Sequence, residues 1–106
     1  MGGIETLTFE FSGARVQPAF EPVLVGVVGS GNLEVLLEPA TAPGCSIRIE
    51  TSARGFAPIW EAVVAAFHQR HDLSGVSISI HDMGATPAVV SLRLDQAVSA
   101  LPERAS

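Results

Sequence analysis

The chain has 106 residues, of which 47% are hydrophobic and 16% are charged, and its formal net charge is -5. This length predicts one domain with a single modest core, spanning residues 1–106, and the composition excludes a disordered chain. Eleven acidic residues stand against six basic ones, without any basic cluster, so the chain lacks the phosphate-neutralising surface of a nucleic-acid-binding protein.

The basic and sulfur-containing residues narrow the chemistry further. All six basic residues are arginine, which excludes Schiff-base catalysis and the lysine of a phosphate-binding loop. Cys45 is the only cysteine, so no internal disulfide can form, as is typical of a reducing compartment. No apolar run approaches the roughly 20 residues of a membrane-spanning helix, and the N-terminus lacks a signal-peptide pattern. We expect a cytoplasmic protein without membrane insertion.

In chain order, alternating polarity first predicts a half-buried strand over residues 5–11. Residues 12–22 contain glycine and proline without any periodicity, which predicts a loop. Residues 23–28 are apolar on both faces, a pattern typical of an interior strand. Residues 33–38 alternate again, so one face of this strand is expected to meet solvent or a partner.

Two further strands are predicted over residues 46–51 and 76–81, each with one polar face. Between them, residues 58–71 predict an amphipathic helix with Pro58 in its first turn. The apolar stripe of this helix comprises Ile59, Trp60, Val63, Val64 and Phe67. The order strand, helix, strand makes the two strands candidates for parallel neighbours joined by a right-handed crossover.

A last helix is predicted from a Thr86 cap and a first-turn Pro87 to about Leu101. The predicted fold class is α+β: a two-layer sandwich with a mostly antiparallel sheet of about five strands and two helices on one face. The other face would be solvated or docked to a partner. Its polar side chains are Arg48, Glu50, Ser77, Ser79 and His81.

A short glycine-rich stretch, Gly29-Ser30-Gly31-Asn32, separates the two apolar runs 23–28 and 33–38. Such a connection is typical of a β-hairpin, which would place Ser30 at its tip. Glycine on both sides accepts positive φ and has no side chain, so the Ser30 hydroxyl would be accessible to a large partner. On local chemistry alone, an ordinary turn explains the pattern as well.

Other candidate sites are weaker. His68, His71 and Asp72 share part of a helix face, but their spacing matches no known metal-binding pattern, and we expect no metal site. Cys45 could be a nucleophile or thioester carrier, although no histidine lies near it in the sequence, and a structural cysteine is commoner.

Two alternatives involve the segment that follows the last strand. A catalytic Ser-His-Asp set could in principle combine Ser30, His81 and Asp82, but a strand rather than a helix follows Ser30, unlike the turn of a hydrolase nucleophile. Residues 81–87 end a strand and open a helix, so their backbone N–H groups could hold an anion. Ordinary helix capping explains that segment equally well.

Three separate motifs together resemble one protein family. They are ETLTFEF at 5–11, VGVVGSGNLEVLLEP at 25–39 and SIHDMGATPAVVSLRLDQA at 79–97. In order and spacing they resemble the acyl-carrier (delta) subunit of malonate decarboxylase. This resemblance covers well over a third of the chain.

The resemblance implies a carrier that performs no chemistry itself. Ser30, between Gly29 and Gly31, would be the attachment point of 2'-(5''-phosphoribosyl)-3'-dephospho-coenzyme A, linked as a phosphodiester. The terminal thiol of this group would carry acetyl and then malonyl. The implied partners are the acetyl/malonyl transferase subunit, the decarboxylase subunit and the phosphoribosyl-dephospho-coenzyme A transferase that attaches the group.

Two other hypotheses remain open from the sequence. The acyl-carrier subunit of citrate lyase uses the same type of prosthetic group, although the GATP start of the last helix and the strands around GSGN favour the malonate family. The chain could also be an unmodified small α+β binding or regulatory domain whose GSGN is only a turn.

Overall fold

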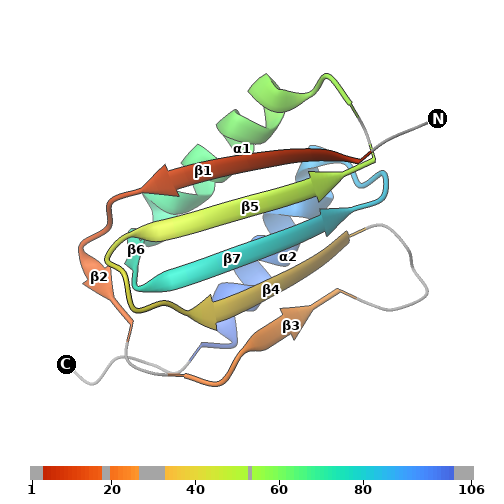
Figure 1. The fold of residues 1–106 in the computed structure, drawn as a ribbon. Coiled ribbons are helices and arrows are strands. Elements are labelled where there is room, and N and C mark those ends of the chain that lie inside the picture. The colour runs from red at the N-terminus through yellow and green to blue at the C-terminus, as the bar shows by residue number, and fades with distance from the viewer. Residues whose placement is uncertain (1–3, 18–19, 27–32, 53, 102–106) are drawn as a thin grey trace.

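The computed structural model describes residues 4–17, 20–26, 33–52 and 54–101. Figure 1 shows two helices behind a twisted sheet. In chain order the elements are β1 (Glu5–Phe11), β2 (Arg15–Val16), β3 (Val23–Val25), β4 (Leu33–Pro39), β5 (Cys45–Thr51), α1 (Ala57–His71), β6 (Leu73–Ser74), β7 (Val76–Asp82) and α2 (Pro87–Ser99).

The main sheet has five strands in the order β1-β5-β7-β4-β3. β5 and β7 pair in parallel, and the other three neighbouring pairs are antiparallel. Parallel neighbours need a long crossover, which α1 provides. The predicted α+β class, the mostly antiparallel sheet and the parallel pairing are therefore confirmed.

Both helices cover the same face of the sheet, as predicted (Figure 1). Burial alternates along β4, β5 and β7, so every second side chain points toward the helices. These side chains and the inner stripes of the helices form one core. Its fully buried members include Val35, Leu37, Ile47, Ile49, Val64, Phe67, Val76, Ile78, Ile80 and Leu94. The opposite face, which we call the outer sheet face, carries the predicted polar residues.

The prediction of an interior strand over residues 23–28 is wrong, because the strand that forms there lies at the edge of the sheet. β3 covers Val23–Val25 and pairs only with β4 within the described residues, at the edge of the sheet. β7 inserts between β5 and β4, which moves the β3–β4 pair outward. Leu24 therefore points away from the helices with 57% of its surface exposed, although its apolar neighbours suggested burial on both faces.

The predicted loop over residues 12–22 contains the two-residue strand β2, which pairs in parallel with β6. This pairing draws the chain close to the end of α1. Gly13 lies against the backbone of Leu73, where a Cβ atom would come within 1.9 Å of the carbonyl oxygen. Only glycine permits this approach.

Both helices follow their predictions with small differences. Thr86 caps α2, since its Oγ1 accepts a hydrogen bond from the backbone N–H of Val89, and the helix ends at Ser99 rather than at Leu101. In α1 most of the predicted stripe packs inward, but Ile59 remains 45% exposed at the start of the helix. Neither described helix combines the length and the apolar character needed to cross a membrane.

Candidate functional site

Three strands bring a residue each to one end of the sheet, here called the Asp82 end. Asp82 of β7 lies between Thr51 of β5 and Leu33 of β4. Both helices begin near this end, because α1 follows β5 and α2 follows β7. The ends of these strands, the starts of both helices and the described residues that flank the β3–β4 connection therefore lie together at the Asp82 end.

The predicted site residues Gly29, Ser30 and Gly31 lie outside the described residues. Their described neighbours are Gly26, after β3, and Leu33, the first residue of β4. β3 and β4 pair antiparallel, as expected for the two arms of a hairpin. The segment that contains Ser30 thus connects to the described structure at the Asp82 end.

Gly26 shows how closely the two arms approach there. Its φ is +120°, and a Cβ atom would lie 2.3 Å from the carbonyl oxygen of Leu33. A larger residue would meet both backbone strain and a clash with β4. The backbone conformation of Gly26 and its close approach to Leu33 therefore require glycine at this position.

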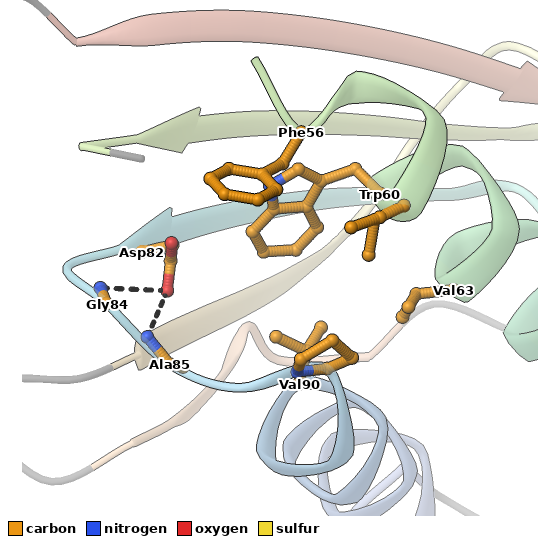
Figure 2. Close-up of a pocket in the computed structure, with 9 residues that line it drawn as sticks. Phe56, Trp60, Val63, Asp82, Gly84, Ala85 and Val90 are labelled. Atoms are coloured by element: carbon orange, nitrogen blue, oxygen red, sulfur yellow. Dashed lines mark hydrogen bonds between the residues drawn. The ribbon is translucent and has the colours of Figure 1, made fainter. Parts of the chain in front are cut away.

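Asp82 fixes the turn from β7 into α2. Its Oδ2 accepts a hydrogen bond from Thr51 Oγ1 at 2.8 Å, and its Oδ1 accepts from the backbone N–H groups of Gly84 at 3.2 Å and Ala85 at 2.8 Å. Figure 2 shows the two bonds to the backbone. The side chain is 1% exposed, so this carboxylate is an internal polar anchor.

The hydrogen bonds of this turn favour ordinary capping over the anion-binding hypothesis for residues 81–87. Two backbone N–H groups of the segment donate to Asp82, and Thr86 caps the helix. An Asp followed two residues later by Gly is a turn signature that the sequence carried. The capping interpretation explains the segment, and an external anion would have to displace the Asp82 carboxylate.

An apolar cavity of about 280 Å³ opens beside this turn, between the starts of α1 and α2 (Figure 2). Trp60 and Val90 line its buried part, whereas Phe56 and Ile59 are nearly half exposed. Asp82 contributes the charged side chain of its wall. Sequence reasoning missed this cavity, because its lining comes from two segments that are distant in the sequence, residues 56–63 and 82–90. The remaining lining residues are Val63, Gly84, Ala85 and Pro87.

The structure contradicts a catalytic set of Ser30, His81 and Asp82. Successive residues of a strand point to opposite faces, so His81 lies on the outer sheet face while Asp82 points inward. His81 Nε2 lies 3.3 Å from Glu50 Oε1, and its Nδ1 lies 3.7 Å from Glu34 Oε1. Its neighbours across the strands are therefore carboxylates of β4 and β5, and Asp82 has other partners.

Cys45 is unsuited to nucleophilic chemistry. It begins β5 at the end opposite to Thr51, and its side chain is 2% exposed. Burial raises the pKa of its thiol to about 12. The reactive thiolate is therefore scarce at neutral pH, and the thiol is inaccessible.

The histidines of α1 have structural partners. His68 is buried, donates from Nε2 to the carbonyl oxygen of Leu73 at 2.9 Å and stacks on the ring of Phe11. His71 pairs with Asp95 of α2 at 2.9 Å. No group of three metal-ligating side chains occurs among the described residues. The expected absence of a metal site remains a prediction for the rest of the chain.

Comparisons with known proteins point to one family. The family described as "ACP: Malonate decarboxylase delta subunit (MdcD)" matches residues 20–101. A malonate decarboxylase acyl carrier protein from Burkholderia cepacia is 70% identical over 97 residues, covering 92% of this chain and 90% of the relative. A malonate decarboxylase acyl carrier protein from Stenotrophomonas maltophilia (strain K279a) is 58% identical over 100 residues, covering 92% of this chain and 94% of that relative.

A solved structure supports the same relationship. It is a crystal structure of a Pseudomonas malonate decarboxylase hetero-tetramer in complex with malonate, and one of its chains is 45% identical to this one with a TM-score of 0.78. The match covers 90% of this chain and 96% of that chain. Sequence and fold therefore agree along nearly the whole length.

Proposed function

Because the chain belongs to the malonate decarboxylase delta subunit family, that of the acyl carrier proteins of this enzyme, we propose that it carries acetyl and malonyl groups on a covalently attached prosthetic group. The group is 2'-(5''-phosphoribosyl)-3'-dephospho-coenzyme A, and its attachment point is the hydroxyl of Ser30, between Gly29 and Gly31. It supplies a terminal thiol on which acyl groups are held as thioesters. The chain itself is a carrier and performs no catalytic step.

The chain's own side chains support the need for an added thiol. A thioester carrier requires an accessible sulfur atom, and Cys45 is the only cysteine in the sequence. Its thiol is buried, and its pKa is raised to about 12. A separate thiol on a long arm fits a chain with this composition.

The observation that carries the assignment to Ser30 is the position of the Gly29-Ser30-Gly31 motif in a member of this family, between two paired strands. β4 is held on its other side by β7, so the arms that flank the motif belong to a stiff sheet. The other serines suit the role less well. Ser77 and Ser79 lie within β7 and Ser91 within α2, where regular structure limits the reach of a hydroxyl.

The proposal includes partners and location. The carrier would present its acyl group in turn to an acetyl/malonyl transferase subunit and a decarboxylase subunit, after a phosphoribosyl-dephospho-coenzyme A transferase has attached the arm. A related chain comes from a malonate decarboxylase hetero-tetramer, which supports assembly with other subunits. A buried, unpaired Cys45 is compatible with the cytoplasm.

The test is the intact mass of protein produced together with the native enzymes that make and attach the group. Wild type should gain a covalent adduct with the mass of the prosthetic group, whereas Ser30→Ala should remain unmodified. The substitution removes one oxygen atom, so the circular dichroism spectrum and the urea midpoint should stay close to those of wild type.

Ser12→Ala is the matched control, because it removes the same atom from an exposed serine in another loop. This variant should be modified like wild type. A folded Ser30→Ala protein that still gains the adduct would overturn the attachment site. Wild type without any adduct would favour an unmodified binding domain.

A further inference from the structure

The apolar cavity lies near Leu33, which follows the proposed attachment point by three residues in the sequence. Consecutive Cα atoms are 3.8 Å apart, so Ser30 lies within about 11 Å of Leu33. Leu33 is paired directly with Asp82, which lines the cavity. An arm of nucleotide and pantetheine length attached to Ser30 would therefore reach the cavity mouth.

From this geometry, and resting on the proposed carrier function, we propose that the cavity encloses the acetylated end of the prosthetic arm and excludes the malonylated end. The occupant would be the neutral acetyl thioester with the adjoining methylene groups. The nucleotide part of the arm would stay outside. The chain would then distinguish between its two cargoes.

Size and lining favour a small neutral occupant. A volume of about 280 Å³ lies at the lower limit of ligand pockets, which limits the occupant to a short chain. The walls are built from Phe56, Ile59, Trp60, Val63 and Val90, whose side chains are apolar or aromatic. Such walls bind methyl, methylene and thioester groups without loss of strong hydrogen bonds to water.

Charge favours acetyl over malonyl. A malonyl group ends in a carboxylate, which would lose its hydration in the cavity and would approach the carboxylate of Asp82. Asp82 already accepts hydrogen bonds from Thr51, Gly84 and Ala85. Those donors are directed to Asp82, so they are not available to neutralise a second carboxylate. The malonyl end should therefore remain in solvent, where a decarboxylase subunit can bind it.

The experiment measures how fast hydroxylamine cleaves the thioester on isolated carrier protein, without enzyme subunits. Acetyl-loaded wild type should react severalfold more slowly than Val63→Phe, in which a larger ring fills the cavity. Leu92→Phe is the control, because Leu92 is exposed on α2 and lies outside the cavity lining. It should react as slowly as wild type. Malonyl-loaded protein should react at one rate in all three.

Fluorescence gives a second readout. Trp60 is the only tryptophan and lines the cavity, so its emission should shift when the arm is acetylated and should not shift when it is malonylated. Equal cleavage rates for acetyl-loaded wild type and Val63→Phe, with unchanged emission, would overturn the inference. Protection of the malonyl form would overturn the charge argument. An absence of any adduct would instead reject the proposed function.

Discussion

At the scale of single residues, His81 and Asp82 show how one strand serves two environments. His81 lies on the outer sheet face between Glu34 and Glu50, and it is roughly half exposed. Asp82, the next residue, is buried and holds the turn that borders the cavity. The alternation of a strand therefore separates a surface charge cluster from an internal anchor.

Cys45 leads to a prediction about thiol reactivity. The folded apoprotein should not react with 5,5'-dithiobis(2-nitrobenzoate), because the thiol is buried and its pKa is raised to about 12. Reaction should follow only after unfolding in urea. Fast labelling of the folded apoprotein would show that the thiol is accessible.

The raised pKa of Cys45 also predicts how the stability of the protein depends on pH. A raised pKa in the folded state contributes stability below the unfolded pKa, near 9, and this contribution is lost as the pH rises toward 12. Cys45→Ala lacks it. The substitution should cost about 1 kcal/mol at neutral pH, and the difference from wild type in urea unfolding should shrink in the alkaline range.

At the scale of secondary-structure elements, Asp95 of α2 connects the two helices. Its Oδ1 accepts from Arg70 at 3.0 Å and from His71 at 2.9 Å, both on α1. Burial by itself raises the pKa of Asp95, but the hydrogen bonds and charges of His71 and Arg70 outweigh it. The pKa therefore lies below its ordinary value of 3.8.

Asp95→Asn should lower the free energy of unfolding by about 0.5 kcal/mol, a small value because these side chains are partly exposed and screened by solvent. The contribution of Asp95 is present above pH 3.8 and is lost as the pH falls through the lower folded-state pKa. Urea unfolding at neutral and acidic pH measures this difference. Glu61→Gln, on an exposed part of α1, is the control. An equal loss of unfolding free energy in both variants would argue against a specific contribution of Asp95 to the contact between α1 and α2.

Much of this architecture could be predicted from the sequence. The alternation in residues 5–11, 46–51 and 76–81 correctly predicted three strands, since the side chains of each alternate between a more buried and a more exposed face. The Thr86-Pro87 start of α2 was also correct. These features depend on local patterns, which a single sequence contains.

Features that depend on distant pairing could not be predicted. β2 and β6 have two residues each, too few for a periodic pattern, and they form only because they meet. The edge position of β3 depends on the insertion of β7. The cavity likewise needs α1, α2 and the Asp82 turn together. Gly29, Ser30 and Gly31 lie outside the described residues, so their assignment still depends on the family and on the motif.

At the scale of the whole molecule, the helices leave the outer sheet face uncovered by described residues (Figure 1). We expect the transferase or decarboxylase subunit to dock there. Exchanging Arg48→Glu with Glu50→Arg preserves the net charge and should weaken assembly, measured by size-exclusion chromatography with purified subunits. Glu61→Arg on α1 is the control. Unchanged assembly after the exchange would place the docking surface on the loops or helices.

The central place of β7 in the sheet also determines how the protein folds. β7 is the last of the described strands in chain order, yet it joins β5 to β4, so the five-stranded sheet cannot be completed before residues 76–82 are available. A chain still emerging from the ribosome should therefore remain unfolded until late in synthesis. Such long-range pairing predicts refolding in roughly milliseconds to seconds, slower than helical bundles of this size. Stopped-flow fluorescence of Trp60 can measure this rate, and microsecond refolding would show that local contacts dominate.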